Sequence, residues 1–371
     1  MENNMLIGFL LRLFLRIVYA PLKLFPVKKK VVMISREFDE PSEDFLALSQ
    51  EIKSRREDVS VVFLCKTIGS SAKDFLSYSI YLLKVCYHLA TSFVCVVDTY
   101  CIPVSVLKHK KSLTVIQIWH ALGALKKFGF QTVGLYEGKN PKTAERMCMH
   151  KNYDLITCAS KKTAEFYAEA FNTDIDKIKV IGMPRIDCIL TPERELKERF
   201  LSDYPNFRSK KIILYVPTFR KGKEVNYKPL TNFDETKYAL IVKPHILSKN
   251  SVEDKYLTEN YSTNSLMKIA DCIITDYSAV SFEASLLSKP LYFYLYDINE
   301  YKDNRGLNID ITKEMPSECY SNADDLIENI MNGEYNFEEL KKFRNTYVET
   351  DDRNNSKRIV DYILNCEVKK G

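Results

Sequence analysis

Several features that often reveal a protein's class are scarce or missing in this chain. Only 11 of its 371 residues are glycine, and neither G-x-G-x-x-G nor G-x-x-x-x-G-K-[ST] occurs, so the usual dinucleotide and P-loop signatures are absent. The ten cysteines include no C-x-x-C pair, and Cys65, Cys95, Cys158 and Cys272 lie inside apolar runs. We therefore expect buried free thiols in a reducing compartment, with neither a disulfide framework nor a metal site.

The net charge of +5 is confined to the amino-terminal segment. Residues 1–30 contain six basic side chains and one acidic side chain, and the rest of the chain carries 48 of each sign. A body with balanced charge does not favour nucleic-acid binding. Hydrophobic residues at 46% and charged residues at 28% are ordinary globular values, and the length suits two domains.

The amino-terminal segment is apolar over residues 5–25 but is interrupted by charge. Arg12 and Arg16 lie in its middle, which disfavours a spanning helix, and lysines at 28–30 follow it, which disfavours a signal peptide. On a helix, Arg12, Arg16 and Lys23 fall within about 40° of one another and form one cationic stripe. We expect an amphipathic helix in the membrane interface, with the lysines reaching anionic headgroups; the alternative is a helix packed on the protein's own body.

Strands and helices alternate along the rest of the chain, which predicts an α/β architecture of two Rossmann-like domains facing a central cleft. A charged stretch between Pro192 and Pro205 is the expected connection. The predicted parts are a membrane-associating segment at 1–30, α/β domains at 31–190 and 205–348, and a C-terminal helix at 349–371. Strands are predicted at 31–35, 59–65, 93–97, 113–118, 155–158, 178–181, 211–216, 239–242, 272–275 and 291–294, and helices at 44–56, 74–90 and 277–288.

Two of the five histidines follow predicted strands. His120 comes after the strand at 113–118, and His245 comes after the strand at 239–242. Open α/β sheets bind ligands at the carboxyl ends of their strands. Either histidine alone would more often be structural, but matched positions in two domains favour acid–base chemistry or the binding of anionic oxygens.

Further strand ends carry hydroxyl, carboxyl and guanidinium groups, which together predict a site for a diphosphate. Ser278 is expected to cap a helix whose amino end binds phosphate, and Glu283 on that helix is expected to reach ribose hydroxyls. An ordinary capped helix is the alternative. The side chains are Thr275, Asp276, Ser278 and Glu283 after the strand at 272–275, Thr218 and Arg220 after 211–216, and Arg185 after 178–181.

The ordered motifs of the chain resemble one known family. They are Trp119-His120, Leu125-Lys126-Lys127-Phe128-Gly129, Gly182-Met183-Pro184-Arg185, Pro217-Thr218-Phe219-Arg220, Lys243-Pro244-His245, Thr275-Asp276-Tyr277-Ser278 and Arg305-Gly306. As a set they resemble the CDP-glycerol glycerophosphotransferases of wall teichoic acid synthesis over residues 27–350. Two positions depart from the usual pattern: Ala121 replaces a glycine, and Ala279 replaces a second serine.

The resemblance implies a GT-B-like fold and a metal-independent transfer that needs no cofactor. Glycerol phosphate would pass from CDP-glycerol, bound by the domain at 205–348, to a hydroxyl of an undecaprenyl-diphosphate-linked acceptor on the domain at 31–190. CMP would be released. The enzyme would act peripherally at the cytoplasmic face of the cell membrane, without nucleic-acid partners, and a homo-oligomer would be compatible with this family.

The resemblance also implies residue roles. His120 would be the catalytic base and His245 a second catalytic residue, while Lys126 and Lys127 would bind the acceptor or a phosphate. The alternatives left open are a CDP-ribitol donor, a nucleotide-sugar glycosyltransferase, and a catalytically silent protein of the same fold that recruits partner enzymes. The implied donor-binding residues are Arg185, Pro217, Thr218, Arg220, Lys243, Thr275, Asp276, Ser278, Glu283 and Arg305.

Overall fold

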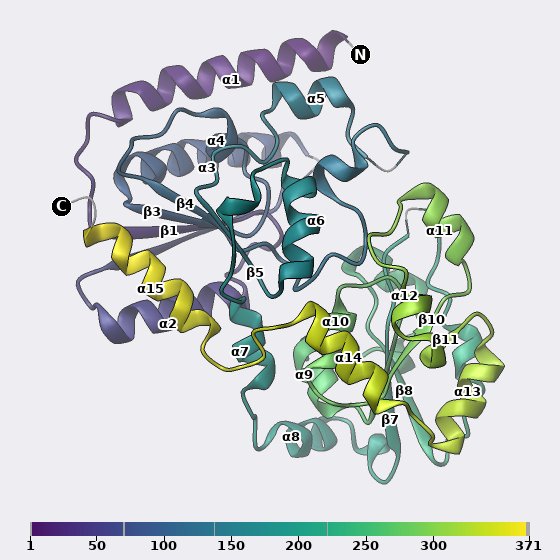
Figure 1. Cartoon of the computed structure of the whole chain (residues 1–371). Coiled ribbons are helices and arrows are strands. Elements are labelled where there is room, and N and C mark those ends of the chain that lie inside the picture. Colours follow the sequence, from purple (N-terminus) through teal and green to yellow (C-terminus); the bar gives the residue numbers. More distant parts are fainter. Residues whose placement is uncertain (1, 70, 137, 221, 369–371) are drawn as a thin grey trace. The chain divides into compact units, whose positions relative to one another are not determined.

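The computed structural model of the chain describes residues 2–69, 71–136, 138–220 and 222–368. These residues form two compact units, which Figure 1 shows in sequence colours. The first unit comprises the described parts of 1–122, 127–188 and 352–371, and the second comprises 123–126 and 189–351. The carboxy-terminal segment therefore belongs to the first unit, and a short segment just after His120 belongs to the second.

A six-stranded parallel sheet, in the order β2-β1-β3-β4-β5-β6, forms the middle of the first unit (Figure 1). The chain runs from β1 outward to β2 and then crosses to β3 on the other side of β1. The topological switch point, where such sheets bind ligands, therefore lies between the carboxyl ends of β1 and β3. The strands are Lys30–Ser35 (β1), Ser60–Cys65 (β2), Val94–Val97 (β3), Thr114–Gln117 (β4), Leu155–Cys158 (β5) and Ile178–Val180 (β6).

Helices cover this sheet, and local sequence signals explain their ends. In α2, for example, Ser42 accepts a hydrogen bond from the backbone N of Phe45, and acidic residues fill the first turn. Helix α15 packs beside α2 over Met33 of β1, through Ile359 and Ile363. The helices of this unit are Glu2–Leu22 (α1), Glu43–Arg55 (α2), Ala72–Thr91 (α3), Ile102–Val106 (α4), Pro141–Arg146 (α5), Lys161–Phe171 (α6) and Asn355–Val368 (α15). Helix α7 (Pro184–Leu190) begins in this unit and ends in the second.

The second unit contains a five-stranded parallel sheet in the order β11-β10-β9-β7-β8. Its switch point lies between β7 and β9, where Val216 is in register with Thr275. The strands are Lys211–Val216 (β7), Tyr238–Val242 (β8), Cys272–Thr275 (β9), Leu291–Tyr294 (β10) and Cys319–Tyr320 (β11). The helices are Leu196–Asp203 (α8), Thr263–Ile269 (α9), Val280–Ser285 (α10), Ile298–Asn304 (α11), Ile311–Glu314 (α12), Ala323–Asn332 (α13) and Phe337–Tyr347 (α14).

The helix predicted at 277–288 is shorter in the structure. Helix α10 begins at Val280 with Ala279 as its N-cap, so Ser278 is not the capping residue. The Ser278 hydroxyl accepts a hydrogen bond from the backbone N of Val280 at 3.4 Å. The preceding residues form a turn instead of a helix because Asp276 accepts the backbone N of Tyr277 at 2.6 Å.

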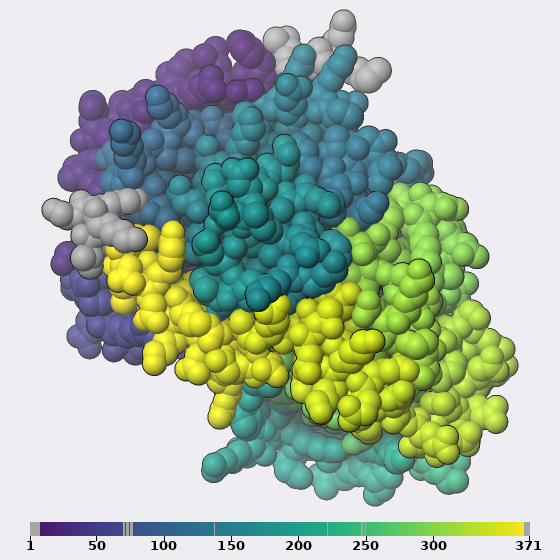
Figure 2. All heavy atoms as spheres, viewed as in Figure 1, coloured from purple at the N-terminus to yellow at the C-terminus, as the bar shows by residue number. Residues whose placement is uncertain are grey.

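Helix α1 packs on the first unit by one face and exposes another. Leu15 and Tyr19 are buried, and the Tyr19 hydroxyl lies 3.1 Å from Nδ1 of His109. Figure 2 shows α1, in purple, at the surface of this unit. Among the described residues, no helix combines the length and apolarity needed to cross a membrane. The large apolar side chains exposed on α1 are Phe9, Leu10, Leu13, Phe14 and Ile17.

Candidate active site

His120 lies at the carboxyl end of the first sheet, just beyond β4. Its Nδ1 is 3.0 Å from the backbone carbonyl oxygen of Asp98, which directly follows β3. Because a carbonyl oxygen can only accept, Nδ1 carries the proton of the neutral ring in this contact, and Nε2 is the basic atom. This arrangement orients the imidazole as a general base requires.

The residue before His120 fixes this orientation further. Trp119 has a φ of 53°, in the left-handed region that a bulky side chain rarely adopts, at a cost of about 1–3 kcal/mol. Its backbone N donates to Oε1 of Gln117 at 2.8 Å. Its ring stacks on Phe128 with centroids 4.8 Å apart and lies 4.2 Å from the His120 ring. Aromatic packing therefore holds a strained turn directly beside the proposed base.

Asp98 itself is an unusual carboxyl group. Its side chain is 2% exposed, and Oδ1 has no hydrogen-bond partner among the described residues. Burial is the main reason that its pKa is raised to about 7, although hydrogen bonds from Ser35 and Thr99 oppose the shift. Asp98 was not among the predicted site residues, even though it directly follows the strand predicted at 93–97.

Two cationic side chains lie close to the same switch point and were also missed. Arg36 directly follows β1, and its Nη1 donates to the backbone oxygen of Tyr100 at 2.9 Å. The Lys139 ammonium lies 4.7 Å from the centroid of the Tyr100 ring. Burial, and next the charge of Arg36, lower the pKa of Lys139. The two cations therefore face one small region at the carboxyl edge of the first sheet.

Arg220 lies at the switch point of the second sheet, where carboxylates surround it. Its Nη1 donates to Oδ2 of Asp276 at 2.8 Å and to the backbone oxygen of Thr218 at 3.0 Å. Its Nε and Nη2 donate to the two carboxylate oxygens of Asp297, at 2.5 and 2.9 Å. Burial alone would lower the pKa of Arg220, but Asp297 and Asp276 raise it above its ordinary value. The guanidinium thus links three segments by hydrogen bonds: the residues that follow β7, the residue that follows β9 and the N-cap of α11.

The neighbouring polar groups shape the same turn. Asp276 is fully buried and accepts the backbone N of Thr218 at 2.9 Å, while the Thr275 hydroxyl donates to the Val216 carbonyl at 2.8 Å. The Thr218 hydroxyl is buried and has no hydrogen-bond partner among the described residues. Of this group, Thr218 is therefore the side chain with unused hydrogen-bonding capacity.

His245 and Lys243 follow β8, next to the β7 end. The exposed His245 ring lies 5.3 Å from the ring of Phe219, centroid to centroid, so this histidine sits beside the loop that carries Thr218. Lys243 Nζ donates to the backbone oxygen of Tyr261 at 2.8 Å. The structure therefore gathers His245, Thr218 and the Arg220 network within the second unit.

Other predicted site residues lie elsewhere. Arg185 belongs to the first unit and pairs with Asp44 of α2, with Nη2 and Oδ2 2.5 Å apart. Lys126 forms an isolated β-bridge with Leu307 in the second unit, whereas Lys127 belongs to the first. Of the remaining three donor candidates, Pro217 directly follows β7, Glu283 is buried in α10 and Arg305 is the C-cap of α11.

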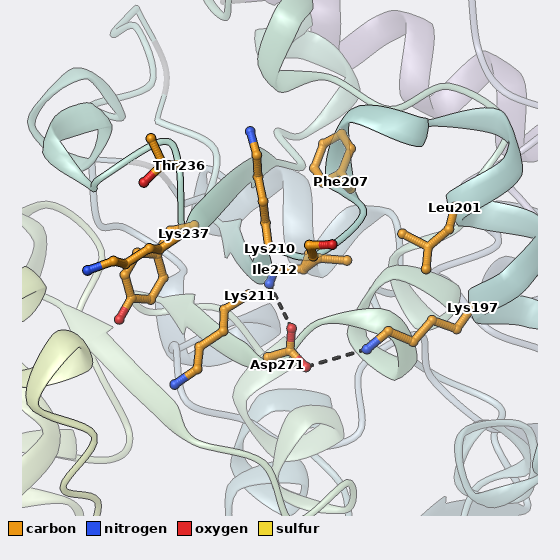
Figure 3. Close-up of a pocket in the computed structure, with 11 residues that line it drawn as sticks. Lys197, Leu201, Phe207, Lys210, Lys211, Ile212, Thr236, Lys237 and Asp271 are labelled. Atoms are coloured by element: carbon orange, nitrogen blue, oxygen red, sulfur yellow. Dashed lines mark hydrogen bonds and ion pairs between the residues drawn. The ribbon is translucent and has the colours of Figure 1, made fainter.

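A lysine-lined hollow in the second unit lacks the geometry of a ligand site. Figure 3 shows this hollow, whose volume is about 660 Å³, at the amino ends of β7 and β8, away from the switch point. The ammonium groups of Lys210, Lys211 and Lys237 point in different directions. Lys197 turns toward Asp271, with Nζ and Oδ1 3.5 Å apart. Specific ligand sites instead need convergent polar groups.

Potential metal ligands do not gather in the described part of the chain. Asp174 and Asp176 form an Asp-x-Asp triplet on a short 3₁₀ turn at Ile175–Lys177, yet no group of three His, Cys, Asp or Glu side chains that could hold an ion occurs among the described residues. All ten cysteines are free thiols, and six of them are buried.

A known wall teichoic acid polymerase has a similar fold. The structure of the wall teichoic acid polymerase TagF matches this chain with a TM-score of 0.77 and 20% sequence identity, covering 99% of this chain and 98% of that chain. The likeness confirms the predicted GT-B-like α/β fold. By its fold, the protein therefore belongs to the class of proteins built from two Rossmann-like units.

Sequence comparison gives the family within that class. The sequence profile of the CDP-glycerol:poly(glycerophosphate) glycerophosphotransferases matches residues 18–365, so the chain belongs to that family. The teichoic acid glycerol-phosphate primase of Bacillus subtilis is 32% identical over 298 residues, which cover 77% of each chain. The teichoic acid poly(ribitol-phosphate) polymerase of Bacillus spizizenii is 31% identical over 366 residues; the match covers 93% of this chain but only 58% of the polymerase. The predicted family is thus confirmed, and its members include enzymes named for either polyol.

Proposed function

We propose that the protein transfers glycerol phosphate from CDP-glycerol to a hydroxyl of a membrane-anchored, lipid-linked acceptor, in the synthesis of teichoic acid or a related cell-surface polymer. The observation that carries the proposal is an oriented histidine, His120, at the carboxyl edge of the first sheet in a chain of this family. The family profile and the glycerol-phosphate primase of Bacillus subtilis support glycerol. The ribitol-phosphate polymerase of Bacillus spizizenii makes CDP-ribitol the second candidate donor.

The chemistry requires a base and a stabiliser of negative charge. The acceptor oxygen bonds to the β-phosphorus of the donor, the bond from that phosphorus to the CMP oxygen breaks, and the hydroxyl proton must be removed. His120 would take the proton at Nε2, because its Nδ1–H is committed to the Asp98 carbonyl. In the second unit, His245 and Lys243 are proposed to offset the charge that develops on the leaving CMP.

We propose that CDP binds at the switch point of the second sheet. The buried Thr218 hydroxyl and the exposed His245 ring beside Phe219 support this assignment. Ser278 and Glu283 are proposed to contact phosphate and ribose, as the family motifs imply. In this proposal Arg220 and Asp276 act mainly by holding the turn in shape, because their polar atoms bond to each other and to neighbouring backbone and carboxylate groups.

Membrane attachment through α1 is part of the proposal. At about 100° per residue, Arg16 and Lys23 fall between the buried face of α1 and its exposed apolar face. Together with Lys108 and Lys151 they line a hollow of about 520 Å³. An exposed apolar face bordered by cations is the pattern of a helix that lies in the interface, with its cations at the headgroups.

The test is a comparison of donors. The protein is incubated with radiolabelled CDP-glycerol, CDP-ribitol or nucleotide sugars, and with a lipid-linked saccharide acceptor. We expect label transfer and CMP release with CDP-glycerol, and their loss in His120→Gln but not in the matched control His88→Gln on α3. Transfer from CDP-ribitol alone would change the donor, transfer of a sugar would overturn the reaction class, and the number of units added would separate a primase from a polymerase.

A further inference from the structure

The switch point of the first sheet carries charge that the proposed mechanism does not use. It lies between the carboxyl ends of β1 and β3, where ligands bind in open α/β sheets. Arg36 is the first residue after β1, and the stretch from Asp98 to Tyr100 directly follows β3. Because these strands are neighbours in register from Val31 with Val94 to Ile34 with Val97, their ends lie side by side.

Arg36 is attached to the same short segment that orients the proposed base. Its backbone N donates to the Thr99 hydroxyl at 3.2 Å, and its Nη1 donates to the Tyr100 carbonyl at 2.9 Å. His120 binds the carbonyl of Asp98 in that segment. The two carbonyls are two residues apart, a separation of at most about 7 Å along the chain. A polyol phosphate could bridge that span, with its phosphate at Arg36 and its hydroxyl at His120.

Lys139 adds a second cation from an irregular loop. Its ammonium lies over the Tyr100 ring, and the Tyr100 hydroxyl donates to the backbone oxygen of Met147 at 2.7 Å, which holds that ring in place. His150, 5.5 Å from Tyr100 by ring centroids, is kept neutral because burial, and next the charge of Lys139, lower its pKa to about 3. The aromatic groups around Lys139 therefore provide no countercharge.

Neither cation is neutralised by the described part of the chain. No carboxylate of a described residue lies within 4.0 Å of the charged group of Arg36 or Lys139, and Nε of Arg36 is buried without a hydrogen-bond partner. Arg36 is half-buried, whereas Lys139 is exposed. Two like charges brought together repel one another, and partial burial adds a desolvation cost for the guanidinium. An anion between them would relieve both costs and would accept the unused donor.

We propose that Arg36 and Lys139 bind a phosphate group of the acceptor and thereby bring its terminal hydroxyl to His120. The ligand class is a phosphate ester of a small polyol, whether it ends a growing chain or joins the acceptor to its lipid. This inference rests on the proposed function for its place in the reaction. Phosphate binding at the site can nevertheless be measured without any transfer.

The first test is equilibrium binding by calorimetry, with sn-glycerol 3-phosphate, inorganic phosphate and glycerol as separate probes. The full chain is compared with Arg36→Gln, Lys139→Gln and the matched control Lys142→Gln, which removes an exposed positive charge from α5. We expect wild type and the control to bind both phosphates but not glycerol, and each site variant to bind about 10- to 100-fold more weakly. Tighter binding of glycerol 3-phosphate than of inorganic phosphate would indicate that the polyol is held as well, and equal binding would restrict the site to the phosphate. Unchanged binding in both site variants would overturn the proposal.

The second test separates acceptor from donor in steady-state kinetics. We expect Arg36→Gln and Lys139→Gln to raise KM for a phosphate-bearing acceptor about 10- to 100-fold, with KM for CDP-glycerol within about twofold of wild type, and Arg36→Lys to recover part of the loss. A rise in the donor KM instead would refute the site. Arg36→Gln also removes a hydrogen bond to Tyr100 and can therefore lower the melting temperature. In that case Lys139→Gln decides the outcome, because the Lys139 side chain bonds to no backbone group of the described residues. If wild type transfers no polyol phosphate but binds glycerol 3-phosphate through these residues, the proposed function fails and the site stands.

Discussion

Replacing Arg220 with methionine tests how the switch point of the second sheet is held together. Methionine keeps much of the aliphatic volume but removes the guanidinium nitrogens that donate to Asp276 and Asp297, whose side chains are 0% and 11% exposed. Removing one partner of a buried ion pair costs about 3–5 kcal/mol, because a buried charge is left unpaired. Whole domains are stable by only about 5–15 kcal/mol, so we expect the loss to be a large part of the stability of the second unit.

Hydrogen exchange of the full chain is the suitable assay, because a two-unit protein need not unfold in a single step. The backbone N–H groups of Thr218 and Tyr277 donate to Asp276, so peptides covering 212–220 and 272–280 report directly on this turn. We expect Arg220→Met to lower their opening free energy by about 3–5 kcal/mol, with no change in the first unit. The exposed Arg194→Met serves as the matched control and should leave exchange unchanged.

A double variant sharpens the interpretation. Adding Asp297→Asn to Arg220→Met removes one of the two unpaired charges, so part of the lost protection should return. If Arg220→Met exchanged like wild type while binding a non-transferable CDP analogue more weakly, the reasoning would be refuted. Arg220 would then serve the donor and not the turn.

Three further predictions follow from single contacts. His120→Gln should reduce turnover by about 10²–10⁴-fold while affinity for a CDP analogue, measured by calorimetry, is kept; near-normal turnover would remove His120 as the base. The folded-state pKa of Asp98, about 7, lies above that of an unfolded aspartate, so wild type loses stability as pH rises from about 4 to about 7. Asp98→Asn should therefore raise the urea midpoint relative to wild type at about pH 8 more than at about pH 5, and an equal effect at both would contradict that pKa. Changing the exposed Phe9, Phe14 and Ile17 of α1 to serine should release the protein from anionic vesicles in flotation without lowering its melting temperature, and continued flotation would refute docking through α1.

The strands were the elements of the fold that the sequence predicted best. Leu155–Cys158, Lys211–Val216, Cys272–Thr275 and Leu291–Tyr294 were predicted with their observed bounds, because continuous apolar runs rich in β-branched or aromatic residues read plainly as buried parallel strands. Strand β11 has only two residues, Cys319–Tyr320, and is too short to leave a pattern. A carboxy-terminal helix was predicted at 349–371, and α15 occupies Asn355–Val368 of that range. Its packing beside α2 depends on contacts that its own periodicity does not specify.

The site was only partly readable from the sequence. The position of His120 followed from its place just beyond a strand, and the same rule would have found Arg36 and Asp98, which directly follow β1 and β3. Lys139 lies in an irregular loop and approaches Tyr100 only in the folded chain. The ion pair of Arg220 with Asp297 joins residues 77 positions apart, so no local sequence motif predicts it. Strand ends therefore indicate where a site lies, whereas its charge pairing appears only in the structure.

Our central proposal is that this chain transfers glycerol phosphate from CDP-glycerol to the acceptor with His120 as the general base. Its most direct measurement is a single-turnover reaction with CDP-glycerol and a defined lipid-linked acceptor, in which released CMP and the product mass are followed together. We predict one CMP for each glycerol phosphate added to the acceptor in wild type, and formation of both products about 10²–10⁴-fold more slowly in His120→Gln. CMP release without a glycerol phosphate gained by the acceptor, or equal rates in the two proteins, would contradict the account.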